Sequence, residues 1–221
     1  LRTTHGAALQ PGQACQMRRR RSQLTHLSLY EDLLGPGEGL SLPRGIRILY
    51  VASGEASSLR ANEAWFGLDE VELEAGGEGA TILRWELTGW EPDDAKLAAH
   101  VDLDPWGEHL MRCDRVDFPP GGIAYLHTHQ GPGIRCLLKG ELTVEAEGRA
   151  TTLGPFGAWF EDGPHPVYAV ASESHETAFV RVMVLPRELL GKPSIRYVLP
   201  EDADKPKSQR YTVFVDEPFA L

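Results

Sequence analysis

The sequence predicts an all-β protein made of two related units, and three observations support this prediction. The chain has 221 residues, of which 23 are glycine and 16 are proline, and this content is typical of β proteins with many turns. Its most regular stretches are rich in β-forming residues, such as RGIRILYVASGE at 44–55 and ATILRWELTGW at 80–90. Landmarks of the first half also recur in the second half in the same order, which indicates an internal duplication.

The duplication rests on four landmarks, which are GIR (45–47 and 133–135), Gly-Glu (54–55 and 140–141), AWF (64–66 and 158–160) and the pair ATILRWEL and TAFVRVMVL (80–87 and 177–185). The alignment places Arg47 opposite Arg135 and Arg84 opposite Arg181. It predicts two β-sandwich or barrel units, one in each half of the chain.

The stretches around the repeats are less regular. Residues 25–34 are expected to form a short helix or a strand that enters the sheet, and GPGEG at 35–39 ends it. The sequence Pro-Asp-Asp at 92–94 could cap a short helix between the two units. Residues 186–193 read as a short helix, and 195–215 as two edge strands around a charged loop.

Composition and charge exclude several classes of protein. The net charge of −10 argues against a nucleic-acid partner, because phosphate binding needs a basic face. No apolar run approaches the roughly 20 residues that a membrane helix needs. The three cysteines, Cys15, Cys113 and Cys136, show no CxxC spacing, so a reducing cytoplasmic setting fits best. No G-x-S-x-G motif occurs, so nucleophilic catalysis has no support, and the glycine-rich stretches lack the features of a phosphate-binding loop.

The strongest functional signal is the stretch GGIAYLHTHQGPGIRCLLKG at 121–140. In a strand, residues i and i+2 point to the same face, so His127 and His129 would lie side by side. Two neutral imidazoles in that arrangement suit one metal ion. The plainer interpretation is a pair of polar strand residues. A third histidine, His165, follows in DGPHPVYAV on a second expected strand.

This stretch resembles the first motif of the cupin superfamily, G-x5-H-x-H-x3,4-E-x6-G, through Gly121, His127, His129 and Gly140. The glutamate of that motif is absent, since Gly133 or Ile134 stands in its place. Gly154 and His165 match the second cupin motif, which is otherwise degraded. The resemblance implies a double-stranded β-helix, the cupin jelly-roll barrel, which the internal repeat would duplicate as a bicupin.

The resemblance also implies a division of the chain. Residues 1–23 are expected to be a flexible N-terminal tail. Residues 24–95 would form a degenerate, metal-free cupin-like unit, because no histidine of the first copy aligns with the three of the second. Residues 96–221 would form the metal-binding unit with C-terminal edge strands. His100 and His109, between the copies, are expected to be surface or linker residues.

The resemblance implies one divalent transition metal held by His127, His129 and His165. Three imidazoles leave positions open for water or substrate. They do not fix the metal, since imidazole suits Zn, Cu, Fe and Ni alike. Fe(II) is favoured by similarity to cupins with three-histidine oxygenase sites, and Zn, Ni, Mn or Cu are alternatives. A distant Glu or Asp could still supply a carboxylate ligand.

Three further residues are candidates for the site. Arg135 is expected to point into the barrel and to bind an anionic group of a substrate, or else to pair with a structural carboxylate. Arg181 has the same two interpretations. Tyr125 has the strand parity of His127 and could donate a proton there, or could simply be a core residue. Glu161 and Asp162 could orient His165 or merely form the turn before it.

Two functions follow from different classes. The first is a mononuclear metal dioxygenase acting on a small, carboxylated organic molecule, with Arg135 and Tyr125 as the candidate catalytic residues. The second is a non-catalytic cupin that binds a small metabolite, with the metal as an anchor. Metal-independent isomerisation through Tyr125 and His127 is a third, weaker alternative. The resemblance also implies a homodimer, and the net charge and the lack of a long apolar run predict that it binds neither nucleic acid nor membrane.

Overall fold

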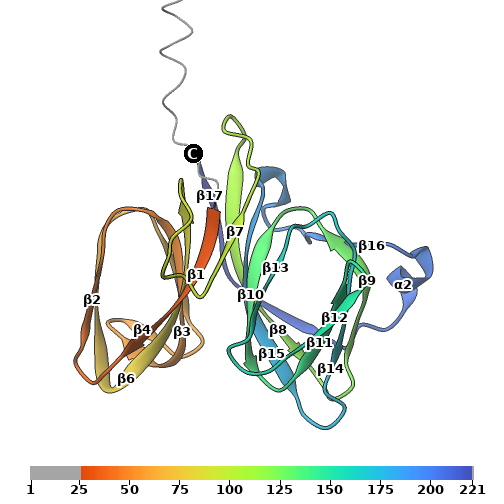
Figure 1. Cartoon of the computed structure of the whole chain (residues 1–221), viewed down its shortest axis with the longest axis horizontal. Helices are drawn as coiled ribbons and strands as arrows, with labels where there is room; N and C mark the ends of the chain where they lie inside the picture. Colours follow the sequence, from red (N-terminus) through yellow and green to blue (C-terminus); the bar gives the residue numbers. More distant parts are fainter. Residues whose placement is uncertain (1–25, 221) are drawn as a thin grey trace, which may run out of the picture.

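The computed structural model describes residues 26–220, and this part of the chain is almost entirely β-structure (Figure 1). The strands of the first half are β1 (His26–Leu34), β2 (Gly39–Leu42), β3 (Ile46–Ala56), β4 (Leu59–Arg60), β5 (Ala64–Gly67), β6 (Val71–Thr88) and β7 (Leu97–His100). The all-β prediction is confirmed. The expected tail, 1–23, lies outside the described residues.

The second half continues with ten strands and two short helical turns. They are β8 (His109–Phe118), β9 (Ile123–His129), β10 (Gly133–Lys139), β11 (Leu142–Ala146), β12 (Arg149–Leu153), β13 (Ala158–Glu161), β14 (Val167–Ala171), β15 (Thr177–Pro186), η1 (Arg187–Leu189), β16 (Ile195–Tyr197), α2 (Pro200–Asp204) and β17 (Arg210–Phe219). Residues 25–34 thus contain a strand, and 186–193 only a 3₁₀ turn. No helix among the described residues is long and apolar enough to cross a membrane.

The first unit is one strongly bent sheet. Its long strand β6 pairs with β2 through its first residues and with β1 and β3 through its last ones, so the sheet folds back over itself. The interior is packed with aliphatic side chains, including Leu49, Val51 and Ile82. Strand β7 pairs with β1 and extends this sheet to His100, a little beyond the expected boundary at 95.

The second unit is a barrel of two five-stranded antiparallel sheets. One sheet has the order β13-β10-β15-β8-β17, and the other has the order β12-β11-β14-β9-β16. Valine, leucine and phenylalanine side chains fill much of the space between these sheets. Strands β16 and β17, which the sequence predicts as edge strands, do lie at the ends of the two sheets.

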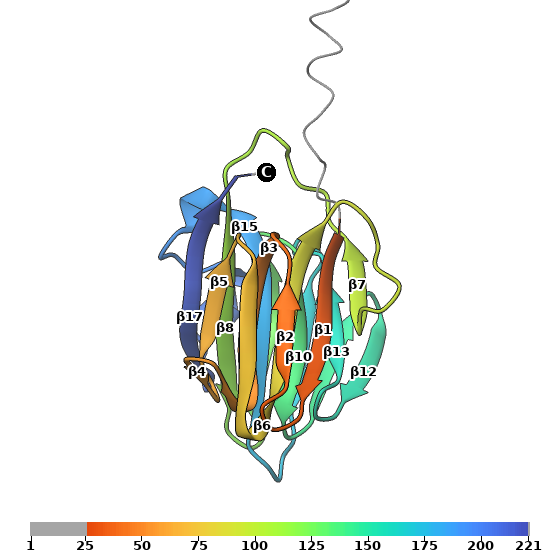
Figure 2. The same ribbon diagram turned by 90° about the vertical axis from the view of Figure 1, so that its left-hand side faces the viewer.

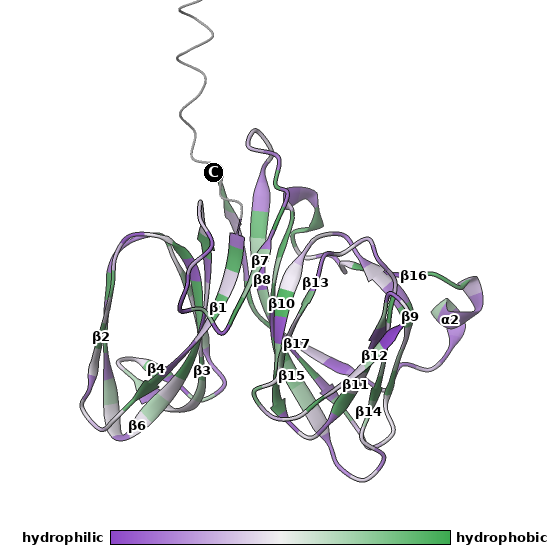
Figure 3. Ribbon diagram, in the orientation of Figure 1, coloured by the Kyte–Doolittle hydropathy of each residue, from purple (hydrophilic) through white to green (hydrophobic). Residues whose placement is uncertain are grey.

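The two units pack through the sheet that contains β1, β3 and β6 and the sheet that contains β8, β10 and β15. Their facing side chains form one shared hydrophobic core. Trp85 is fully buried there and donates a hydrogen bond of 3.2 Å from its indole nitrogen to the carbonyl oxygen of Ile134. Hydrophobic residues follow the facing strands (Figure 3), and the strands of both units run in a similar direction (Figure 2).

Strand pairing supports the duplication and corrects its register. The order β5-β3-β6-β1 in the first unit matches β13-β10-β15-β8 in the second. Ile48 pairs with Phe66 and Trp85, and Ile134 pairs with Phe160 and Val182. The AWF landmark aligns Phe66 with Phe160, and the last landmark aligns Trp85 with Val182. Since Ile48 and Ile134 pair with these equivalent residues, Ile48 rather than Ile46 corresponds to Ile134.

The counterpart of Arg135 is therefore Leu49, and not Arg47 as the GIR landmark indicated. Arg47 corresponds instead to Gly133. The side chain of Arg47 is buried against Glu86 at 2.9 Å and bonds to the carbonyl of Asp69, so its role is structural. Arg47 thus gives no information about the role of Arg135.

We expect Trp85→Ala to lower the free energy of unfolding by about 3–5 kcal/mol, because it leaves a cavity in the core that joins the units. Trp85→Phe should cost less, since it retains most of the apolar contact. Trp90→Ala is the control, because Trp90 is 67% exposed, and it should change stability by less than about 0.5 kcal/mol. Urea unfolding followed by circular dichroism measures all three. Equal effects of Trp85→Ala and Trp90→Ala would contradict a shared core.

Candidate functional site

The candidate site lies inside the second barrel, between its two sheets. A small cavity of about 20 Å³ is present there, which is room for roughly one water molecule. Its polar lining residues are His127, His129, Glu161, Arg181 and Tyr211. Apolar residues of both sheets close the remainder.

His127 and His129 lie side by side on β9, as the alternation of the strand predicts. Their ring centroids are 4.9 Å apart. The Nδ1 atom of His127 lies 2.6 Å from the carbonyl oxygen of Tyr125, and that of His129 lies 3.2 Å from the hydroxyl of Ser194. Because a carbonyl only accepts, His127 donates from Nδ1 and keeps an acceptor at Nε2.

Burial keeps both imidazoles neutral. It lowers the pKa of His127. It also lowers the pKa of His129 well below its usual range, and the positive charges of Arg181 and Arg135 add to this effect. Neutral imidazole is the form that binds a metal or accepts a hydrogen bond.

Glu161 brings a carboxylate to the histidine pair. It lies at the end of β13, and its Oε2 atom is 3.7 Å from Nε2 of His129. The same oxygen is 2.6 Å from Nη2 of Arg135 in an ion pair without hydrogen-bond geometry. The other oxygen accepts a hydrogen bond of 2.8 Å from the indole of Trp159. Burial lowers the pKa of Arg135 to about 10, against the opposing effect of Glu161, so Arg135 is charged at neutral pH.

The missing cupin glutamate has a steric explanation. Gly133 pairs with Met183, and a Cβ atom at position 133 would lie 2.5 Å from the carbonyl oxygen of Val182. It would also lie 3.1 Å from Nη1 of Arg135. The space that a glutamate would need at this position is therefore filled by backbone and by Arg135.

Arg181 is held by Asp114 directly beside the histidines. Its Nε and Nη2 atoms donate to the two carboxylate oxygens of Asp114 at 2.6 and 3.1 Å. Its Nη1 atom lies 3.3 Å from Nε2 of His129. Burial lowers the pKa of Arg181, but the charge and hydrogen bonds of Asp114 outweigh this effect, so the pKa is raised.

The structure places Tyr125 outside the cavity. Ala124 pairs with Ala169 and His127 pairs with Val167, so β9 contains one residue more than β14 between these pairs. Such a bulge interrupts the alternation of side chains. The Tyr125 ring accordingly lies 4.7 Å from the ammonium group of Lys205 on the outside of the barrel. The parity argument for Tyr125 as a proton donor was wrong for this reason.

His165 also lies apart from the histidine pair. It stands on the loop between β13 and β14 with its side chain 58% exposed, and its Nδ1 atom pairs with the carboxylate of Asp162. The expected three-histidine arrangement is therefore not assembled in the structure. Within residues 26–220, no group of three or more His, Cys, Asp or Glu side chains is arranged to hold a metal ion as it stands.

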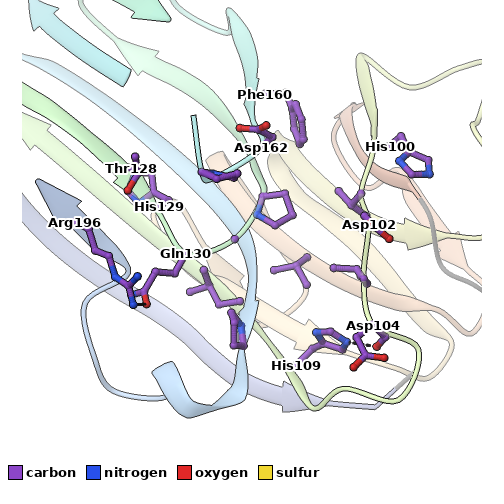
Figure 4. A pocket seen from close by; sticks show the side chains of 18 residues that line it. His100, Asp102, Asp104, His109, Thr128, His129, Gln130, Phe160, Asp162 and Arg196 are labelled. Carbon is purple, nitrogen blue, oxygen red and sulfur yellow. Dashed lines mark hydrogen bonds between the residues drawn. The ribbon is translucent and has the colours of Figure 1, made fainter. Parts of the chain in front are cut away.

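A wider cleft of about 850 Å³ lies outside the barrel, next to the turn after β9 (Figure 4). The turn and the connection between the two units line it, and His129 is shared with the barrel cavity. Arg196 bonds to Gln130 on one side. On the other side His109 is buried and its Nε2 atom lies 2.8 Å from the carbonyl of Asp104. His109 begins β8, so it is not the surface or linker residue that the sequence predicts.

Asp114 is the residue that sequence reasoning missed, and Glu161 was considered only as a residue that could orient His165 or form the turn before it. The signal for both was strand alternation. Phe160 and Cys113 pack in the core between the units, so their neighbours in sequence point into the barrel.

These features define an all-β protein of two related units with a buried histidine pair in the barrel of the second, and comparison with known proteins identifies the fold. No family model and no curated protein matches the sequence. A variant of oxalate decarboxylase from Bacillus subtilis aligns with a TM-score of 0.56 at 12% identity, over 81% of this chain and 74% of that chain. Salicylate 1,2-dioxygenase from Pseudaminobacter salicylatoxidans gives 0.53 at 9% identity, over 85% and 74%.

AerE from Microcystis aeruginosa aligns with a TM-score of 0.54 at 12% identity, over 72% of this chain and 88% of that chain. At these identities the similarities establish the fold. The protein has the cupin fold, a jelly-roll β-barrel, as the sequence predicts.

Asp114→Ala should lower the free energy of unfolding by about 3–5 kcal/mol, because it leaves the buried charge of Arg181 unpaired. The double variant Asp114→Leu with Arg181→Met should recover most of this loss, since both charges leave together. Lys139→Ala removes an exposed ion pair with Glu176 and should produce no measurable change. Chemical denaturation measures the set. A double variant no more stable than Asp114→Ala would show that the pair does more than neutralise charge.

Proposed function

We propose that the second barrel binds one divalent transition metal ion, with His127 and His129 as ligands and Glu161 as the third donor. The main support for this proposal is that two buried, neutral imidazoles and one carboxylate line the same cavity of about 20 Å³. Two histidines and a carboxylate are the donor set of many non-haem iron sites. Glu161 would take the place that the sequence assigned to His165.

The distances support this donor set. Nitrogen and oxygen ligands lie about 2.0–2.2 Å from such metals, so two of them at a tetrahedral angle are about 3.4 Å apart. The separation of 3.7 Å between His129 Nε2 and Glu161 Oε2 is close to this value. The Nδ1 contacts to Tyr125 and Ser194 are of the kind that orient metal-binding imidazoles.

Metal binding would require one ion pair and one hydrogen bond to change. Glu161 would turn from Arg135 towards the metal, and Arg181 would release Nε2 of His129. Arg135 would then lose its carboxylate partner. A guanidinium in a closed site needs an anionic partner, so Arg135 would be available to a carboxylate of the substrate.

The finer proposal is a dioxygenase that acts on a small carboxylated molecule. A divalent metal would supply a Lewis-acidic centre, and Fe(II) would in addition supply redox chemistry. One structural neighbour is a salicylate 1,2-dioxygenase, and salicylate is itself a small carboxylate. Zn, Ni, Mn and Cu are the alternative metals. A homodimer and a cytoplasmic setting belong to the same proposal.

A metal-independent ligand-binding barrel is the second candidate. The observation that favours it is the contact of 3.3 Å between Arg181 Nη1 and His129 Nε2. This contact uses the lone pair that a metal would need. In that case His127, His129 and the two arginines would bind a small polar ligand directly.

Elemental analysis of protein purified without added metal tests the primary proposal. We expect near-stoichiometric metal in the parent protein and its loss in His127→Ala and in His129→Ala. Glu161→Gln should weaken metal binding by about 10- to 100-fold. His165→Ala should retain the metal, as should the matched control His175→Ala on an exposed hairpin.

Loss of metal in His165→Ala but not in Glu161→Gln would restore the three-histidine assignment. No metal in the parent protein, even after anaerobic reconstitution with Fe(II), Zn(II) or Mn(II), would overturn the proposal and leave the metal-independent barrel.

Oxygen consumption tests the finer proposal. Iron-loaded protein should consume O₂ when small aromatic or aliphatic carboxylates are added. Arg135→Leu should abolish this oxygen consumption but lower the metal content much less. Uptake that is equal for carboxylates and their amides would contradict a role of Arg135 in binding the anionic group.

A further inference from the structure

A groove of about 470 Å³ opens on the side of the barrel where β16 and β17 form the edges of the two sheets. Its charged and aromatic lining residues include Arg112, Asp114, Arg181, Lys192, Tyr211 and Asp216. This volume is within the range of about 300–1,000 Å³ that small-molecule sites occupy.

The groove adjoins the histidine cavity. Arg181 and Tyr211 line both spaces. The centre of the Arg181 guanidinium lies 5.8 Å from the centroid of the Tyr211 ring. These two side chains therefore separate the groove from His129, and a ligand in the groove would lie against the far side of the Arg181–His129 contact.

Arg181, which lines the groove, retains hydrogen-bonding capacity. A guanidinium carries five N–H groups. Asp114 accepts from two of them and His129 contacts a third, so two remain for which residues 26–220 supply no hydrogen bond. A planar pair of N–H donors matches a carboxylate in bidentate geometry.

Of the two other cationic side chains in the lining, Arg112 and Lys192, Arg112 is already neutralised. Arg112 makes two bonds to Asp216, both of 2.9 Å, and two to the carbonyl oxygens of Leu189 and Lys192. Since Asp114 and Asp216 balance two of the three cationic side chains in the lining, one positive charge is left over, which favours a ligand with a single negative charge over a dianion such as a phosphate monoester.

Apart from Lys192 and Ser194, the side chains of the remaining walls are largely apolar. Tyr211 is 44% exposed and Val213 is 55% exposed on β17. Ile195 and Tyr197 of β16 face them across the groove. Exposed apolar side chains gathered around one buried charge are typical of a site for an amphipathic ligand.

We propose that this groove binds a small organic monocarboxylate with an apolar body, its carboxylate on Arg181 and its body against Tyr211 and Val213. The site goes beyond the metal function proposed above and does not depend on it. Because Arg181 also contacts His129, occupancy of the groove would also affect the histidine cavity.

Calorimetric titration with matched probes tests the proposal. Phenylacetate and isovalerate are the acids, and phenylacetamide and isovaleramide are their neutral controls. As-purified and chelator-treated protein are titrated in parallel, so that a failure of metal binding and a failure of the groove are distinguished. We expect at least one acid to bind about tenfold or more tightly than its amide.

Variants locate the binding. Val213→Asp should weaken acid binding at least about tenfold, because it places a like charge in the groove. Val198→Asp is the matched control, since Val198 is similarly exposed at 41% but is not part of the lining, and it should bind as the parent does. Arg181→Lys, checked for native circular dichroism, should lose the preference for acid over amide.

Three results would overturn the proposal. They are an absence of binding by both acids, equal affinity for acids and amides, and equal weakening by Val213→Asp and Val198→Asp. Size-exclusion chromatography of Val213→Asp is run alongside. A change from dimer to monomer without any acid preference would assign the groove to contact with a second copy of the chain and would also reject the ligand site.

Discussion

The barrel depends on the neutralisation of two guanidinium groups buried in its interior. Arg135 and Arg181 stand opposite one another on paired strands, and each is held by a carboxylate from another strand of the same sheet. A buried charge without a partner costs several kcal/mol, so Glu161 and Asp114 are fixed in turn. The histidine pair on the facing sheet meets this charged layer, and the positive charges help to keep His129 neutral. The chemistry of the site therefore follows from how these arginines are paired.

The first unit shows what the same fold does without one of these pairs. In the register of the strands, Leu49 corresponds to Arg135 and Gly67 corresponds to Glu161, so both members of the pair are replaced together. A Cβ atom at Gly67 would collide with the indole ring of Trp65. Aromatic and aliphatic side chains thus occupy the space that holds charge in the second unit. The counterpart of Arg181, Arg84, retains its charge and pairs with Asp32 on β1. The first unit instead supplies the sheet that covers the barrel through the core around Trp85.

The fold could be predicted from the sequence because it depends on patterns that extend over many residues. The β-rich runs, the turns and three of the repeat landmarks agree with the strand pairing, and His127 and His129 share a face as their spacing requires. The failures are all local. One bulge in β9 turned Tyr125 outwards, and the loop before β14 left His165 exposed. The GIR landmark was misaligned by two residues, which keeps the same face of the strand and so left the hydrophobic pattern unchanged. The alternation of inward and outward side chains is the same in the two registers, so it does not distinguish them. The inward direction of Glu161 follows from the outward direction of its neighbour Phe160. That direction could be known only once the packing of Phe160 against the first unit was known.

The size of the interior cavity limits what the site can do. A cavity of about 20 Å³ accommodates an ion or a water molecule, whereas the groove beside it is more than ten times larger. An organic ligand therefore fits beside the histidines only from the groove or after the barrel opens. Arg181 is the one charged side chain that lines both spaces, and its contacts with Asp114 and His129 join them. A ligand that takes hydrogen bonds from Arg181 would weaken its contact with Nε2 of His129, which is the contact that metal binding also has to displace. The two proposed sites would then support each other through one guanidinium group, because each favours the arrangement in which Arg181 leaves His129.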